Sequence, residues 1–92
     1  MGTLVDLKLL ERIHKALGNR RRLAILRYLK RSPGTSVGAI ATHISISFNA
    51  TSKHMIILAA AGFVEREQVG LNMLYRLACR LPMTAEAIVA DL

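Results

Sequence analysis

The chain has 92 residues, of which 52% are hydrophobic, and it carries a net charge of +7. A length of this order makes one domain at the small end of what buries a sufficient core, and it excludes a second independent domain. No apolar run approaches the roughly 20 residues that a membrane span needs, and we expect no secretory signal at the N-terminus. The single cysteine, Cys79, excludes an internal disulfide and favours a cytoplasmic location. An intersubunit disulfide or a redox-sensing thiol is the alternative reading of Cys79.

The charges are distributed unevenly along the chain. Between Glu11 and Glu65 there is no carboxylate, whereas nine lysines and arginines and all three histidines lie in that stretch. A basic surface of this kind suits nucleic acid, anionic lipid or an acidic protein. The apolar fraction is more than a monomer of this size readily hides, so we expect a homodimer.

The first two predicted elements are amphipathic helices. Gly18 ends the first, and Asn19 caps the second, which is broken at 32–34. The apolar residues of both helices recur at steps of three or four. They are Leu4, Leu7, Leu10, Ile13 and Leu17 in the first helix, and Leu23, Leu26 and Leu29 in the second.

A short helix, a tight polar turn and a longer helix follow. Thr35 or Ser36 caps the short helix, and Ser47 caps the longer one, which runs over 48–61 and ends at Gly62. The inward side chains of the short helix are Val37, Ile40, Ala41 and Ile44. From Val37 to His54 the chain therefore has the arrangement that places a helix in the major groove of DNA.

The rest of the chain predicts a β-hairpin and a last helix. Strands over 63–68 and 73–77 are joined across 69–72, and Pro82 separates them from a helix over about 84–92. The predicted fold class is mainly α (α+β), with four helices, a hairpin and a C-terminal helix in one domain over residues 1–92.

The longer helix has polar side chains toward its N-terminal end, while Met55, Ile56 and Leu58 are expected to pack inward. An asparagine can contact adenine through two hydrogen bonds, a lysine reaches guanine or phosphate, and a helix N-terminus favours an anion. We therefore predict DNA contacts by Ser47, Asn49, Thr51, Ser52, Lys53 and His54. The alternatives are simple surface exposure and, for Ser52, a hydrogen bond back to its own helix.

An arginine cluster, 20–22, stands at the start of the second helix. Positive charge is unfavourable at a helix N-terminus, so something must offset its cost. We predict that Arg20 and Arg21 anchor phosphates, a solvated helix start being the alternative.

Three segments resemble the ArsR-type winged helix-turn-helix transcriptional regulators: ALGNRRRLAILRYL, SVGAIATHISISFNATSKHMIILAAAGFVERE and LYRL. The resemblance runs from about Ala16 to Leu77. It implies a winged helix-turn-helix dimer that represses transcription by occupying operator DNA, with an internal salt bridge at Arg22. The first and last helices of such a dimer pair across a two-fold axis. The implied dimer interface is formed by Leu7, Leu10, Ile13, Leu17, Ile88, Val89 and Leu92.

The chain departs from this family at two places. Many members sense metals through a Cys-x-Cys pair on the third helix, where this chain has Ser36 and Gly38. The other familiar metal site of the family needs Asp and His ligands on the last helix, where this chain has Glu86 and Asp91 and no histidine after His54. We therefore expect no metal and no cofactor. In the wing, acidic residues replace the usual basic ones, so the predicted wing contacts reduce to Arg66 and Asn72, and most DNA contacts shift to helices two to four.

Catalysis would need a group of carboxylates, histidines or thiols, and the recognition region has no acid to orient its histidines. We therefore expect no enzyme. The predicted function is sequence-specific binding of double-stranded DNA as a homodimer by a transcriptional repressor without a metal sensor. The alternatives are a winged-helix module for protein–protein interaction and a nonspecific nucleic-acid-binding protein.

Overall fold

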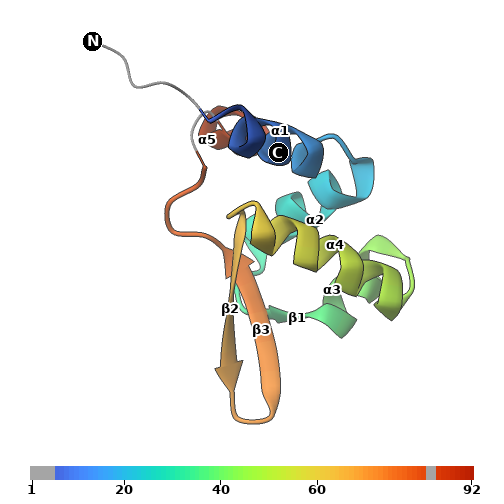
Figure 1. Ribbon diagram of the computed structural model, residues 1–92. Coiled ribbons are helices and arrows are strands. Elements are labelled where there is room, and N and C mark those ends of the chain that lie inside the picture. The colour runs from blue at the N-terminus through green and yellow to red at the C-terminus, as the bar shows by residue number, and fades with distance from the viewer. Residues whose placement is uncertain (1–5, 83–84) are drawn as a thin grey trace.

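The computed structural model describes residues 6–82 and 85–92 (Figure 1). Its elements in chain order are α1 (Leu7–Leu17), α2 (Arg20–Arg31), β1 (Thr35–Ser36), α3 (Val37–Ile44), α4 (Phe48–Ala60), β2 (Val64–Val69), β3 (Asn72–Leu77) and α5 (Ala85–Ala90). The predicted positions of Leu4 and Thr84 lie outside the described residues. No helix in the described ranges is long and apolar enough to cross a bilayer.

Figure 1 shows that α1 and α5 lie at one end of the molecule and that the β2–β3 hairpin extends from the other. Between them, α2, α3 and α4 pack around the core. Within the described residues, fifteen buried side chains form one hydrophobic cluster. Each of the five helices contributes to it, and so does Phe63 between α4 and β2. The fold class predicted from the sequence is confirmed.

Polar side chains begin the first four helices by accepting hydrogen bonds from free backbone N–H groups. Asn19 caps α2 at 3.0 Å from the backbone nitrogen of Arg21, and Ser47 caps α4 at 3.1 Å from that of Ala50. Both predicted caps are confirmed. Of the two candidates for α3 the cap is Ser36, because Thr35 is drawn into a strand.

That strand, β1, was not predicted. It pairs antiparallel with β3, with Thr35 opposite Tyr75, so in the part of the chain that the structure describes the sheet has three strands in the order β1-β3-β2. The hairpin is also longer than expected, because Val69 pairs with Asn72 and leaves only Gly70 and Leu71 in the loop. Gly70 has a φ of 63°, the left-handed conformation that a two-residue hairpin turn requires at its first position.

One inward-facing prediction on α4 is wrong. Met55 and Leu58 are buried, but Ile56 is 67% exposed. The buried stripe of the helix runs through Thr51, Met55 and Leu58 at steps of four and three, which places Ile56 outside it. The outer face of α4 is therefore more apolar than predicted from the sequence.

Candidate nucleic-acid interface

The helix-turn-helix is formed by α3, a tight turn and α4. Ser45 ends α3 in the left-handed conformation with a φ of 61°, and the N–H of Ile46 donates to the carbonyl of Ala41 at 3.2 Å. Ile40 and Ala41 of α3 are buried, as are the three residues of the α4 stripe. The turn and this packing fix one face of α4 against the protein and leave the opposite face outward.

The outward face of α4 brings together part of the predicted DNA-contacting set. Asn49 and Lys53 are exposed and lie one helical turn apart, and Ser52 between them is half-buried. Ser47 is exposed at the N-terminus, where its hydroxyl oxygen is already held as the helix cap. Asn49 and Lys53 are therefore the side chains best placed to reach base edges.

Thr51 does not belong to this face. Its side chain is fully buried, and its Oγ1 donates to the carbonyl oxygen of Ser47 at 2.8 Å. The predicted DNA contact of Thr51 is wrong because the residue lies in the α4 stripe that packs on the core. The four-residue step from Thr51 to Met55 is the sequence signal that identifies it.

Arg22 holds three groups at once. Its Nε donates to the carbonyl of Ala16 at 2.7 Å, its Nη2 to that of Lys15 at 2.8 Å, and its Nη1 lies 3.2 Å from Nδ1 of His54. The first two acceptors are unpaired carbonyls at the C-terminal end of α1, where a cation is favourable. The salt bridge expected for Arg22 is wrong: within the described residues, helix carbonyls and an imidazole take the place of a carboxylate.

His54 is half-buried and turned toward α2. Burial lowers the pKa of His54, and the positive charges of Arg22 and Arg21 lower this pKa further. The neutral imidazole can accept from Arg22 at Nδ1 and carries its proton on Nε2. Only that second nitrogen remains for the DNA contact predicted at this residue.

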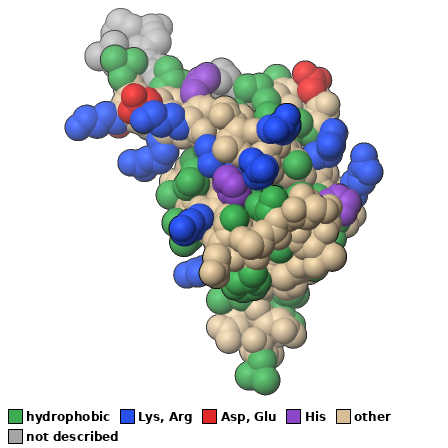
Figure 2. Space-filling model, turned by 90° about the vertical axis from the view of Figure 1, so that its right-hand side faces the viewer, with side chains coloured by type: hydrophobic (Ala, Val, Ile, Leu, Met, Phe, Trp, Pro, Cys, Tyr) green, Lys and Arg blue, Asp and Glu red, His purple; other side chains and the backbone are tan. Residues whose placement is uncertain are grey.

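Two exposed basic residues stand beside the Arg22–His54 pair. Arg20 and Arg21 are exposed at the start of α2. In Figure 2 lysine and arginine side chains spread over the upper part of the face, and the acidic side chains are confined to its upper edge. Nothing on this face repels a phosphate backbone near its centre.

The wing is close to electrically neutral. Arg76 lies opposite Glu65 with Nη2 and Oε2 3.1 Å apart, and its Nη1 lies 4.0 Å from Oε2 of Glu67. Arg66 and Asn72 pair with Tyr75 and Val69, so they project from opposite faces of the hairpin. The two predicted wing contacts are therefore not brought together.

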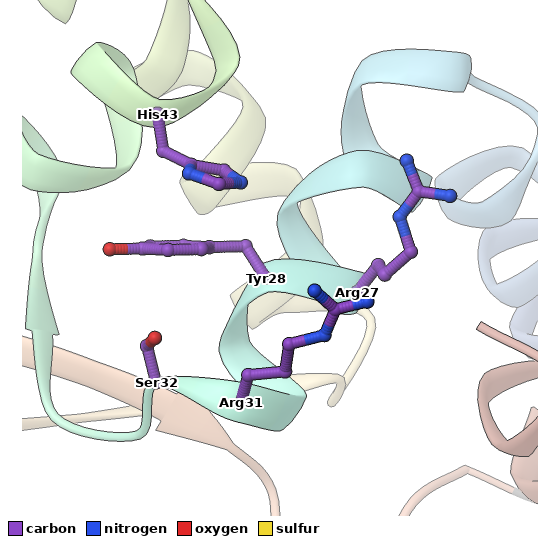
Figure 3. A pocket seen from close by; sticks show the side chains of 5 residues that line it. All are labelled: Arg27, Tyr28, Arg31, Ser32 and His43. Atoms are coloured by element: carbon purple, nitrogen blue, oxygen red, sulfur yellow. The ribbon is translucent and has the colours of Figure 1, made fainter.

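A second basic surface, not predicted from the sequence, lies between α2 and α3. The rings of Tyr28 and His43 stack with centroids 4.0 Å apart and planes 18° apart. With Arg27, Arg31 and Ser32 they line a pocket of about 230 Å³, in which both guanidinium groups lie to one side of the stacked rings (Figure 3). The four-residue step between the arginines is visible in the sequence, but the partner of Tyr28 is not.

The predicted dimer residues divide into two groups. Ile13, Leu17 and Val89 are buried in the core of their own chain, so they are not available to a second subunit as predicted. Leu7 is 76% exposed and Ile88 is 39% exposed, and Leu10 and Leu92 are half-buried. No group of three or more histidine, cysteine, aspartate or glutamate side chains that could hold a metal occurs in the described ranges.

Comparisons with known proteins agree with this geometry. A family model described as a helix-turn-helix domain matches residues 17–67, more than half of the chain. The HTH-type transcriptional regulator YgaV of Escherichia coli is 34% identical over 61 residues, which are 66% of this chain and 62% of that protein. The match thus spans less than two thirds of the length of YgaV.

Two solved structures extend the likeness to almost the whole chain. The homodimeric winged helix-turn-helix DNA-binding domain of a possible ArsR-family regulator from Mycobacterium bovis is 30% identical, with a TM-score of 0.76 over 99% of this chain and 82% of that one. An ArsR-like transcriptional regulator from Rhodococcus is 31% identical, with a TM-score of 0.73 over 91% and 72%. The chain belongs to the helix-turn-helix family and is a winged helix-turn-helix protein of the ArsR type.

Proposed function

We propose that this protein is a cytoplasmic transcriptional repressor that binds double-stranded DNA sequence-specifically as a homodimer. The observation that carries the proposal is the outward face of α4, where exposed Asn49 and Lys53 stand one turn apart on a helix fixed by its cap and its buried stripe. A helix presented in this way fits the major groove, and these side chains suit adenine and guanine or phosphate.

The exposed basic residues at the start of α2 supply the second part of the interface. The hydrogen bond between Arg22 and His54 holds the start of α2 next to α4, and Arg20 and Arg21 stand at that start. Phosphate contacts by these two arginines would therefore set the position of α4 on the duplex. Occupancy of an operator then excludes other proteins from the same DNA, which is how we propose that repression arises.

Dimerisation places two α4 helices on one duplex. Leu7 and Leu10 line an open apolar hollow of about 340 Å³ with Glu11 and His14 on α1, and Ile88 is exposed on α5 at the same end of the molecule. The related domain from Mycobacterium bovis is homodimeric. We propose that α1 and α5 form the subunit contact through these exposed side chains.

Selection of bound duplexes from a random DNA library tests the proposal. Enrichment of a palindrome is expected, since a two-fold dimer reads two half-sites. Absence of any enriched sequence would contradict specific recognition. Affinity for the selected duplex should also be the same with added Zn²⁺ and with chelator, because we propose that no metal controls binding.

A protein–protein interaction module is the second candidate function. Exposed apolar side chains favour it: Ile56 on α4, and Val69 and Leu71 on the wing, of which Leu71 is 99% exposed. The two functions differ in their salt dependence. Phosphate contacts give an affinity that falls steeply as salt rises, whereas an apolar interface does not.

A further inference from the structure

A groove of about 590 Å³ lies between α1 and the C-terminal half of α4. It is lined by Lys8, Glu11, Arg12, Lys15, Arg22 and Ile57. Three of the basic residues follow one side of α1 at steps of four and three, and Ile57 supplies an apolar surface on α4 that is 40% exposed. Its volume is in the range typical of sites for small organic molecules.

The charge of the groove selects the ligand. Four cationic side chains face a single carboxylate, that of Glu11, and the salt bridges within the described ranges are confined to the wing. A ligand that carries negative charge is therefore the one that balances the positive charge of these side chains. It also has to offer an apolar part to cover Ile57 and the alkyl stems of the lysines and arginines.

We propose that this groove binds a small amphipathic carboxylate and that its occupation weakens DNA binding. The apolar body of the ligand lies on Ile57, and its carboxylate pairs with Arg12 and Lys15 and reaches Nη1 of Arg22. The regulatory half of this proposal rests on the proposed function, whereas the binding half does not.

Arg22 connects the groove to α4. The same guanidinium that lines the groove donates to Nδ1 of His54 at 3.2 Å. A carboxylate in the groove competes for this guanidinium, because a charged acceptor is stronger than a neutral imidazole. His54 then loses its donor, α4 loses a tie to α2, and the added negative charge lowers the attraction for phosphate.

The binding half is tested without DNA, with octanoate as the probe and octan-1-ol as its uncharged match. Calorimetry should show octanoate binding several-fold more tightly than octan-1-ol, and nuclear magnetic resonance should show shifts at Lys15 and Ile57. Equal affinity for the two compounds, or the absence of shifts at these residues, would overturn the site.

A matched pair of double variants locates the ligand. Arg12→Gln with Lys15→Gln should weaken octanoate binding several-fold. Arg27→Gln with Arg31→Gln removes the same charge at the pocket of Figure 3 and should leave octanoate binding unchanged. Equal losses in the two variants would show a general charge effect and reject the groove, and octanoate that splits a dimer into monomers would identify the groove as a subunit contact instead.

The regulatory half is tested by fluorescence anisotropy on the selected duplex. Octanoate should lower the affinity of the unaltered protein several-fold and leave the Arg12→Gln, Lys15→Gln variant unaffected. Octanoate bound in the groove with no change in DNA affinity would overturn the coupling. A protein that selects no duplex would instead refute the proposed function, and the titration without DNA would still decide on the groove.

Discussion

Nη1 of Arg22 and Nδ1 of His54 lie 3.2 Å apart, which ties the first turn of α2 to the middle of α4. The same guanidinium donates to two carbonyls at the end of α1. One side chain thus joins three helices, and the helix proposed to read DNA is held by the same residue that closes α1.

Replacement of Arg22 tests this junction. Arg22→Ala should lower the free energy of unfolding by about 3 kcal/mol, because three hydrogen bonds from a charged donor are lost and two carbonyls lose their partners. Arg20→Ala, at an exposed neighbour, should change it by less than about 0.5 kcal/mol. Urea denaturation monitored by circular dichroism measures both values, and equal effects would contradict the junction.

The pH dependence of stability follows from His54. Its pKa is lowered in the folded protein by burial and by the charges of Arg22 and Arg21, which face it from α2. The unfolded state therefore binds the proton first as pH falls below about 6.5, so stability is full above this pH and decreases below it. His54→Gln should remove this part of the decrease and His43→Gln should retain it, as measured by thermal unfolding at a series of pH values. A profile unaltered by His54→Gln would refute the assignment.

Asn49 and Thr51 should behave differently although both were predicted to contact DNA. Asn49→Ala should cost roughly 1–3 kcal/mol on the preferred duplex and relax the preference at one position of each half-site. Thr51→Val should keep that preference and instead lower the stability of the protein by about 1 kcal/mol, because the hydrogen bond to Ser47 is lost. Binding to a panel of single-base variants separates the two outcomes, and a changed base preference in Thr51→Val would contradict its burial.

The two carboxylates of the wing should oppose DNA binding. Glu65→Gln with Glu67→Gln releases Arg76 and should raise DNA affinity, with a salt dependence steeper by about one phosphate contact. Glu86→Gln with Asp91→Asn removes the same charge near the opposite end of the molecule and serves as the control. An equal gain in both variants would mean that net charge, and not the wing, is responsible.

The subunit contact should respond to exposed rather than buried residues. Leu7→Ser with Ile88→Ser should dissociate the dimer and leave a folded monomer, since both side chains project from the surface. Ile13→Ala should instead lower the free energy of unfolding by about 2–5 kcal/mol, because Ile13 fills the core of its own chain. Light scattering and urea denaturation distinguish these outcomes, and a dimer that survives the double change would reject the proposed contact.

Local signals in the sequence were sufficient for much of the fold. Asn19 and Ser47 act on backbone groups two or three residues away, so their capping roles could be read directly. The strand β1 could not, because its two residues owe their conformation to Tyr75 and its neighbour, some 40 positions further along the chain.

The candidate site was predicted less completely for the same reason. Asn49 and Lys53 follow from the polarity of α4, but the burial of Thr51 depends on which stripe of the helix meets α3. The bond of Arg22 to His54 and the stack of Tyr28 on His43 join residues that only the packed helices bring together. The residue types indicate a basic surface for binding a partner, and tertiary packing decides which of their side chains remain exposed on that surface.

Lys30 gives the C-terminal helix an anchor that comes from the DNA-binding core. Its Nζ donates to the carbonyls of Val89 and Ala90, each at 3.1 Å, at the end of the short helix α5. A six-residue helix has little stability of its own, so its placement depends on this cation and on the burial of Val89. Neutralisation of one lysine, as by acetylation, would therefore weaken the attachment of α5 at a point distant from the outward face of α4, so that assembly could be altered separately from the reading of bases.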